Sequence, residues 1–577
     1  MTTATQPQPQ TPKPTTVRVT GAEAVLLALV AEGVETIFGY PGGAIMPIYD
    51  ALYGYEDRLR HILTRHEQGA VHAAQGYARV TGRPGVCFAT SGPGATNLIT
   101  GIADAHIDST PLVCVTGQVA SSLLGTDAFQ ETDVVGISMP VTKWNHQITS
   151  ADEVAEVMAR AFYVARNGRP GPVLIDITKD AQFGETDFAY RPCEGIRSYA
   201  PYPAPAAGSL EAAAALIDAA QKPYLLVGQG VLISGAQAEL RALVEKAGVP
   251  VASTLLGLSA FPADHPLYVG YLGMHGNYGC NVLTNECDLL IAVGMRFDDR
   301  VTGDLKRYAR QAKVIHVEID PAEIDKNVKT TVAVNADARA ALAGLLPLVR
   351  ERRHDAWLAE FKRLDAVEWE KVVGPALHRD EGGIRMSEVI HHLSELTDGQ
   401  AVVVTDVGQH QQVTSRYYRY RGTLTNVTSG GLGTMGFALP AALGAKLGRP
   451  DKEVIAVIGD GGFQMTLQEL GTIFQYKIGV KVVILNNSFL GMVRQWQQLF
   501  FDRRYSSTEM VNPDFVKLAE AFSITAARVE ARDALVDALK TMRAHQGSYL
   551  LEVVVEKEEN VFPMVPSGAS VSDIRLE

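Results

Sequence analysis

The sequence is poor in cysteine, in long hydrophobic runs and in positive charge. Its five cysteines include no Cys-x-x-Cys pair, which argues against a zinc scaffold or a disulfide framework and favours a reducing cytoplasm. The longest early apolar stretch, residues 24–31, is far shorter than the ~20 residues that span a bilayer. Lysine and arginine (52) are outnumbered by aspartate and glutamate (64), so the net charge is -12. We therefore expect a cytoplasmic protein whose partners include neither nucleic acid nor a membrane.

The composition predicts a globular protein of several domains. Hydrophobic residues make up 46% and charged residues 20%, and the 577 residues correspond to three or four domains at roughly 150 residues each. Strand-like apolar runs alternate with amphipathic helical stretches, which is typical of an α/β fold with doubly wound parallel sheets. We place three such domains at 17–190, 205–348 and 386–577, the last ending in a C-terminal lid. Residues 1–16 are expected to be a disordered tail, and 349–385 a linker that begins as an exposed helix.

The third segment carries two competing motifs. Residues 431–436 fit GxGxxG after a predicted strand, which by itself suggests a dinucleotide site. However, the next predicted strand, 453–460, ends in GDGG, and the one after it, 480–487, ends in a pair of asparagines. The carboxyl ends of adjacent parallel strands lie together, so Asp460 and Asn487 are expected to meet there. Such oxygen donors suit Mg²⁺ shared with a diphosphate.

GDGG followed by NN resembles the thiamine-diphosphate signature, and residues 17–569 resemble the large, catalytic subunit family of acetolactate synthase, also called acetohydroxyacid synthase. The matching stretches include FGYPGGAIMPIYDAL, RHEQGAVHAAQGYAR, SGPGATN, RFDDRVTG, TSGGLGTMGFALPAA and LGMVRQWQ. The resemblance implies that the first domain binds the pyrimidine of thiamine diphosphate, the third its diphosphate, and the middle one FAD. It also implies a transferase that joins two pyruvates into 2-acetolactate and CO2, or pyruvate and 2-ketobutyrate into 2-aceto-2-hydroxybutyrate, for valine, leucine and isoleucine biosynthesis.

The resemblance assigns three catalytic residues. Glu67 drives the cofactor's pyrimidine into its imino form, so that the ring's own amino group can remove the C2 proton. Met435 is the apolar wedge that folds the cofactor into a V, and Gln130 lies beside the thiazolium ring. The implied metal ligands are Asp460, Asn487 and the backbone carbonyl of Phe489. The other residues matched to the thiamine cofactor are Gln409, His410, Gly433, Thr434, Gly461, Gly462 and Met492.

The middle domain carries the residues matched to FAD. Strand-end acids suit a ribose hydroxyl and an arginine suits a pyrophosphate, and the implied role of FAD is largely structural because the reaction has no net redox change. The matched residues are Arg169, Gly228, Leu272, Gly273, Met274, His275, Gly294, Arg296, Asp298, Asp299, Arg300, Glu318, Ile319 and Asp337. The residues matched to substrate are Gly43, Phe129, Lys179, Arg300, Met492 and Trp496. Ala120 and Thr178 stand where relatives often have proline.

The resemblance also implies partners, and it leaves two alternatives. We expect a homodimer or homotetramer with active sites at the subunit interface, and a small regulatory subunit. A pyruvate oxidase has the same three domains with FAD in a redox role, although Trp496 and the FDDRVTG stretch favour the synthase. An inactive paralogue that serves as a binding scaffold is disfavoured because Glu67, Met435, Asp460 and Asn487 are all present.

Overall fold

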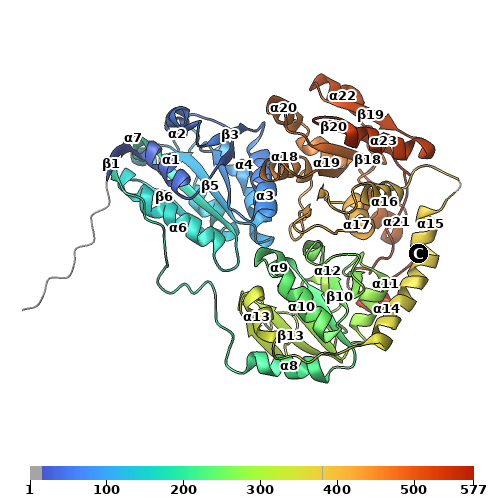
Figure 1. The fold of residues 1–577 in the computed structure, drawn as a ribbon. Helices are drawn as coiled ribbons and strands as arrows, with labels where there is room; N and C mark the ends of the chain where they lie inside the picture. Colours follow the sequence, from blue (N-terminus) through green and yellow to red (C-terminus); the bar gives the residue numbers. More distant parts are fainter. Residues whose placement is uncertain (1–15, 380) are drawn as a thin grey trace, which may run out of the picture.

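The structure is a computed structural model that describes residues 16–379 and 381–577. The tail expected at 1–16 lies, except for its last residue, outside these described residues. Three six-stranded parallel sheets follow one another along the chain, each flanked by helices (Figure 1). The predicted α/β fold with three doubly wound sheets is therefore confirmed.

The first sheet has the strand order β3-β2-β4-β5-β7-β6. Its strands are β2 (Thr36–Gly39), β3 (Arg60–Leu63), β4 (Gly85–Ala89), β5 (Leu112–Gln118), β6 (Trp144–Ile148) and β7 (Pro172–Thr178). The helices that matter for the site are α3 (Glu67–Thr81), α4 (Pro93–Ile107) and α7 (Lys179–Phe183). An antiparallel pair, β1 (Val17–Thr20) and β8 (Glu185–Phe188), joins the start and the end of this domain.

The second sheet has the order β11-β10-β9-β12-β13-β14. Its strands are β9 (Pro223–Val227), β10 (Val251–Ser253), β11 (Tyr268–Tyr271), β12 (Leu289–Val293), β13 (Lys313–Glu318) and β14 (Val332–Asn335). Around it lie α8 (Ser209–Ala219), α9 (Gln229–Ile233), α10 (Gln237–Ala247), α11 (Tyr278–Thr284), α12 (Asp299–Thr302) and α13 (Ala338–Leu345).

The third sheet has the order β16-β15-β17-β18-β20-β19. Its strands are β15 (Val402–Thr405), β16 (Asn426–Thr428), β17 (Val454–Gly459), β18 (Lys481–Asn486), β19 (Thr525–Val529) and β20 (Tyr549–Val554). Its helices are α16 (Met386–Leu396), α17 (Gln409–Tyr417), α18 (Ala438–Gly448), α19 (Asp460–Thr466), α20 (Glu469–Gln475), α21 (Gly491–Phe500), α22 (Phe515–Ala521) and α23 (Arg532–Ala544).

The first and third domains share one hydrophobic core. Helix α3 packs against α18, and one buried cluster contains apolar side chains from both domains (Figure 1). Two glycines allow this approach: a Cβ added at Gly76 would lie 1.9 Å from the Ala441 carbonyl oxygen, and one at Gly444 would lie 1.8 Å from that of Ala73. Any side chain at either position would push the helices apart.

The connecting helix is less exposed than expected. Helix α14 (Asp355–Glu368) begins the segment, and its Trp357, Phe361 and Leu364 side chains are buried against the middle domain. The expectation of an exposed helix was therefore wrong for one face. Sequence reasoning gave weight to the charged residues and overlooked the apolar residues at helical spacing between them.

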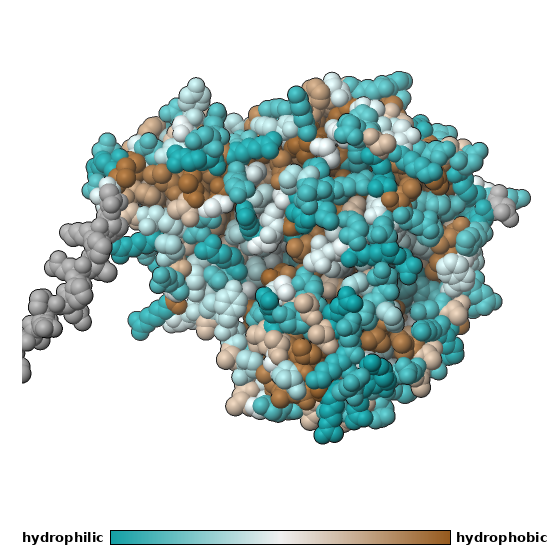
Figure 2. Space-filling model, viewed as in Figure 1, coloured by the Kyte–Doolittle hydropathy of each residue, from teal (hydrophilic) through white to brown (hydrophobic). Residues whose placement is uncertain are grey.

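The outer surface is mostly hydrophilic on the face seen in Figure 2, with apolar atoms in separate patches. Within residues 16–379 and 381–577, no helix combines the length and the apolar composition required to cross a bilayer.

Candidate active site

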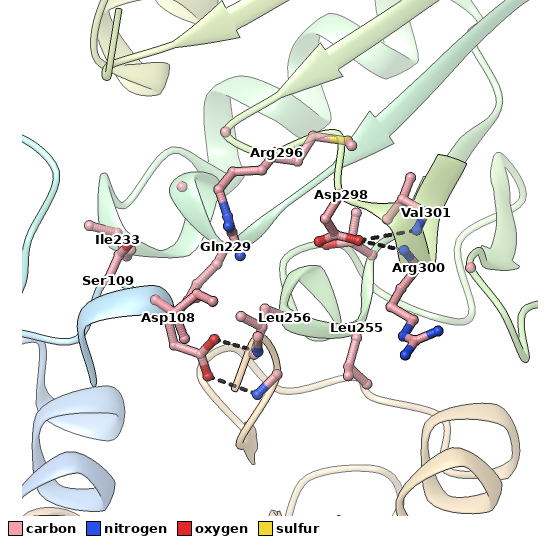
Figure 3. A pocket seen from close by; sticks show the side chains of 18 of the residues that line it. Asp108, Ser109, Gln229, Ile233, Leu255, Leu256, Arg296, Asp298, Arg300 and Val301 are labelled. Atoms are coloured by element: carbon pink, nitrogen blue, oxygen red, sulfur yellow. Dashed lines mark hydrogen bonds between the residues drawn. The ribbon is translucent and has the colours of Figure 1, made fainter. Parts of the chain in front are cut away.

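A cavity of about 1080 Å³ lies where the three domains meet. The carboxyl ends of β9, β12, β13 and β14 open onto it from the middle domain, which is where open α/β sheets bind ligands. Figure 3 shows part of its wall. Nearly all residues matched to FAD line it: Arg169, Leu272, Gly273, Met274, His275, Gly294, Arg296, Asp298, Asp299, Arg300, Glu318, Ile319 and Asp337. Gly228 lies behind the wall, because an added Cβ there would lie 2.2 Å from the Gly294 carbonyl oxygen.

The acids in this cavity are of two kinds. Asp298 and Asp337 cap helices: Asp298 accepts hydrogen bonds from the backbone of Arg300 and Val301 at 3.0 and 3.2 Å (Figure 3), and Asp337 caps α13 in the same way. Glu318, at the end of β13, accepts only a backbone hydrogen bond from Asp320 among the described residues. Burial raises the pKa of Glu318 to about 7. The capping bonds of Asp298 and Asp337 use Oδ1 alone, so within the described residues all three acids keep one carboxylate oxygen for a ligand hydroxyl, and Glu318 is the one that caps no helix.

Nitrogen groups face the same cavity. The His275 ring is buried, and its Nδ1 lies 3.2 Å from the Pro563 carbonyl oxygen, so Nδ1 must donate. Its Nε2 has no partner within the described residues, and burial lowers the pKa of His275 to about 4. The neutral ring thus presents an unpaired acceptor. Arg296 extends toward Gln229 in Figure 3, and the described part of the chain offers its guanidinium no ion pair. Arg169, in contrast, pairs with Asp320 at 3.1 Å.

The same cavity reaches residues from the third domain. Gly433 lines it, as do Met492 and Trp496 of α21. The exposed Arg300 guanidinium shares this cavity with them. The residues matched to FAD and part of those matched to substrate therefore surround one continuous space.

Asp460 and Asn487 stand at the ends of two hydrogen-bonded neighbours, β17 and β18, as the sequence indicated. Both are buried, and burial raises the pKa of Asp460 to about 6. The Asn487 amide donates to Gln409 Oε1 at 3.4 Å, and its oxygen accepts the Phe489 N–H at 3.2 Å. In the part of the chain that the structure describes, no hydrogen bond is donated to the Phe489 carbonyl. One carboxylate, one amide oxygen and one carbonyl are thus available to a cation.

Neighbouring side chains occupy the space that a side chain would need at two of the GDGG glycines. A Cβ added at Gly462 would lie 1.7 Å from Asp406 Oδ2, and one at Gly461 would lie 2.7 Å from the Leu490 side chain. His410 lies beside this turn, 3.0 Å from a Cβ added at Gly459. Its Nε2 is buried and has no partner among the described residues, and burial lowers the pKa of this histidine to about 3.

Glu67, Gln130 and the SGPG turn come together in the first domain. Glu67 is the first residue of α3 and is 8% exposed, and Asn97 donates to its Oε2 at 2.9 Å. A Cβ added at Gly94 would lie 3.2 Å from the other carboxylate oxygen, Oε1. Gln130 has a φ of 61°, and its carbonyl oxygen would lie 2.8 Å from a Cβ added at Gly92. The turn therefore needs glycine because these groups approach it closely.

The remaining matched residues lie around this first-domain group. Gly43 adjoins Ala44, whose N–H donates to Thr90 Oγ1 at 3.2 Å just before the SGPG turn. Phe129 is 88% exposed. Lys179 opens α7, and its N–H donates to the Val119 carbonyl. None of these three, nor Glu67 or Gln130, lines the large cavity, so the matched residues form separate groups in this single chain.

Several polar residues in these groups were missed from the sequence. Asn97 holds Glu67, and Asn512 donates to Asp460 Oδ2 at 2.7 Å and to Asn486 Oδ1 at 2.9 Å. Asp406 approaches Gly462. Asn97 stands inside the SGPGATN stretch and could have been selected there. Asn512, 52 residues after Asp460, has no comparable sequence signal.

Comparisons with known proteins agree with this arrangement. Three family models match in order: the N-terminal TPP binding domain of thiamine pyrophosphate enzymes at residues 19–137, their central domain at 210–345 and their C-terminal TPP binding domain at 406–553. An acetolactate synthase large subunit from Corynebacterium glutamicum is 46% identical over 97% of this chain and 90% of its own length. The large subunit of acetolactate synthase isozyme 2 from Escherichia coli is 47% identical over 96% and 99%, respectively. A probable acetolactate synthase large subunit from Methanocaldococcus jannaschii is 45% identical over 96% and 95%. The chain belongs to the acetolactate synthase large-subunit family of thiamine pyrophosphate enzymes.

Proposed function

We propose that this chain condenses two pyruvates into 2-acetolactate and CO2, or pyruvate and 2-ketobutyrate into 2-aceto-2-hydroxybutyrate. The observation that carries the proposal is the Glu67 carboxylate: it is almost fully buried, one oxygen is held by Asn97, and Oε1 accepts no hydrogen bond within the described residues. A carboxyl group fixed in this way can share a proton with a ring nitrogen. Thiamine diphosphate, when bound, supplies the carbon nucleophile and the electron sink for decarboxylation. Gln130 would lie beside the reacting centre, and Met435 would be the apolar wedge that holds the cofactor bent.

The third domain would hold the diphosphate and Mg²⁺. Asp460, the Asn487 amide oxygen and the Phe489 carbonyl fit a hard cation, because Asn487 accepts one hydrogen bond there and an amide oxygen has two lone pairs. The unpaired His410 Nε2 suits a hydrogen bond to the cofactor. The other proposed contacts are Gln409, Gly433, Thr434, Gly461, Gly462 and Met492.

The large cavity would hold FAD. Its volume of about 1080 Å³ suits a dinucleotide, and the free oxygen of Glu318, the unpaired His275 Nε2 and the unpaired Arg296 supply polar contacts. Because condensation of two keto acids needs no electron acceptor, we assign FAD a structural role that joins the three domains around it.

The acceptor keto acid would lie at the end of this cavity. Trp496 and Met492 offer an apolar surface for its alkyl group, and the Arg300 guanidinium suits its carboxylate. Gly43, Phe129 and Lys179 would approach from the first domain of a second copy.

We further propose a homodimer or homotetramer. The first-domain group around Glu67 suits one end of thiamine diphosphate and the third-domain group around Asp460 suits the other end, and the two groups are separate in the single chain. Apolar side chains near both are exposed: Phe129 (88%), Met465 (52%) and Val511 (100%). A second copy would cover such side chains and complete each site. A small regulatory subunit is proposed from the family.

The decisive experiment incubates purified protein with pyruvate, thiamine diphosphate, Mg²⁺ and FAD, and measures acetolactate with and without 2-ketobutyrate. We expect acetolactate from pyruvate alone and the mixed product when 2-ketobutyrate is added. Oxygen consumption with acetate formation would instead identify an oxidase. Absence of any product and of thiamine diphosphate binding would identify a non-catalytic scaffold.

A further inference from the structure

Three buried carboxylates hold the Met435 loop, defined as residues 428–437. Asp406, from the same domain, accepts the N–H groups of Gly436 and Phe437 at 3.0 and 3.2 Å. The other two, Asp104 and Asp108, come from the first domain, more than 300 positions away in the chain. Met435 therefore lies between residues that are fixed on both sides.

Asp108 fixes the start of this loop. Its two carboxylate oxygens accept the N–H groups of Gly430 and Gly431 at 2.8 and 2.7 Å, and Figure 3 shows both hydrogen bonds. Arg79 of α3 pairs with Asp108 at 2.7 Å and donates to the Thr428 carbonyl at 2.6 Å. The two charged side chains are 0% and 5% exposed, so solvent weakens this pair little.

Asp104, one helical turn before Asp108, fixes the end of the loop. Its Oδ1 accepts the Thr434 hydroxyl at 3.0 Å and the Ser429 hydroxyl. The Ser429 oxygen in turn accepts the Thr434 N–H at 2.8 Å. The residue directly before Met435 is therefore held through both its backbone and its side chain.

Both carboxylates stand at the end of α4, whose start holds Glu67. Asn97, the fifth residue of the helix, donates to Glu67, and Asp104 and Asp108 are in the last turn and at its C-terminal cap. A helix of 15 residues is about 22 Å long and rigid. One helix thus connects the group that would act on the pyrimidine with the loop that would bend the cofactor.

We propose that Asp104 and Asp108 are positioning residues that set the Met435 side chain from the first domain, so that α4 fixes both Glu67 and Met435. This inference rests on the proposed function. In the proposed dimer, Glu67 and Met435 of one chain serve different active sites, so α4 would also connect the two sites. The partners of Asp108 are Gly430, Gly431 and Arg79, none of which is a proposed contact of the cofactor or the metal, so thiamine diphosphate binding should persist without its charge.

The test replaces Asp108 by asparagine, which keeps the shape but removes the charge that holds Arg79 and the second backbone N–H. We expect the dissociation constant of thiamine diphosphate, measured by fluorescence quenching, to change little. Deuterium exchange at C2 of the bound cofactor should fall about 10-fold or more, because a displacement near 1 Å can cost up to 10²-fold. The double variant Asp108→Asn/Met435→Ala should exchange no more slowly than Met435→Ala alone.

The control is Asp288→Asn, because Asp288 accepts two backbone N–H groups, from Gln221 and Lys222, outside all the groups described above. It should leave C2 exchange unchanged. If Asp108→Asn does not fold, Asp104→Asn replaces it, and its C2 exchange is measured at saturating thiamine diphosphate because Asp104 contacts Thr434. Two results would overturn the inference while the proposed function stands. One is a C2 exchange rate of Asp108→Asn equal to that of the wild type. The other is an equal fold-loss of C2 exchange when Asp108→Asn is added to the wild type and to Met435→Ala. A wild-type protein with neither exchange nor acetolactate would instead overturn the proposed function.

Discussion

The two thiamine domains and the middle domain are joined in different ways. The first and third domains share one apolar core, in which α3 and α18 touch at Gly76 and Gly444, and the Asp108 carboxylate that binds Gly430 and Gly431 across it is buried. The middle domain has its own apolar clusters, one on each face of its sheet. It meets the first domain beside the large cavity through the partly exposed pair of Arg169 and Asp320. The first interface is closed without a ligand, whereas the second leaves space that a ligand would fill.

The largest expected effect is on chemistry at Glu67, the first residue of the helix α3 that packs in the closed interface. Glu67→Gln removes the ability to exchange a proton with the pyrimidine and should lower kcat by about 10²- to 10⁴-fold. Thiamine diphosphate should still bind, because the proposed diphosphate contacts are in the third domain. Acetolactate formation and cofactor binding are measured in parallel, with Glu56→Gln, in another part of the first domain, as the control. Near-normal activity of Glu67→Gln would refute the assignment.

The second largest effect is expected from a substitution in the core that the first and third domains share. In Gly444→Ala the new Cβ must move from 1.8 Å to at least 3.0 Å from the Ala73 carbonyl oxygen, which separates α3 from α18. The gain in helix propensity is about 1 kcal/mol. The overlap outweighs it, and we expect a net loss of about 1–3 kcal/mol. The thermal midpoint should fall, whereas Gly54→Ala, which meets nothing within 4 Å, should leave it nearly unchanged. Equal midpoints would show that the helices can separate freely.

A smaller effect is expected on how the stability of the protein depends on pH, through Glu469 at the same interface. Glu469 accepts the Arg65 N–H, and burial raises the pKa of its carboxyl to about 7. The folded protein therefore binds this proton more tightly than the unfolded chain, so its contribution to stability is complete below pH ~4.5 and is lost as pH rises through about 7. The thermal midpoint of Glu469→Gln should fall less than that of the wild type between pH 6 and pH 8. If the thermal midpoints of the wild type and of Glu469→Gln fell in parallel with pH, Glu469 would not be the origin of the pH dependence.

The smallest effect is at the open interface. Arg169→Met removes the pair with Asp320, whose side chains are 25% and 26% exposed, and should lower stability by about 1 kcal/mol or less. Its retention of FAD during gel filtration should fall more clearly, because Arg169 lines the cavity. Arg241→Met, which removes an exposed pair with Glu245, is the matched control. If Arg169→Met strongly destabilised the protein in the absence of FAD, the two interfaces would not differ in the way described.

Much of the fold and part of the site were predictable because they depend on local patterns. Alternating strands and helices indicate parallel sheets, and strand ends meet at one edge of a sheet, so Asp460 and Asn487 could be placed together in advance. The capping roles of Asp298 and Asp337 were not anticipated, since an acid at a strand end suits either a ligand or a helix. The buried face of α14 was overlooked for the same reason: its charges were more conspicuous than its apolar spacing.

The sequence by itself determined the fold class, the order of the three domains and the residue types at each strand end, because these follow from hydrophobic periodicity and short motifs. Only the tertiary structure decided which distant groups meet. Asp108 and Gly430 are 322 positions apart, and no local rule predicts that a carboxylate at the end of α4 holds two backbone N–H groups of another domain. The sequence shows glycine at positions such as Gly76, Gly444 and Gly462 but not why it is required there. The requirement is steric, because other atoms pack against each of these residues. Long-range packing determined how Glu67 and Met435 are held.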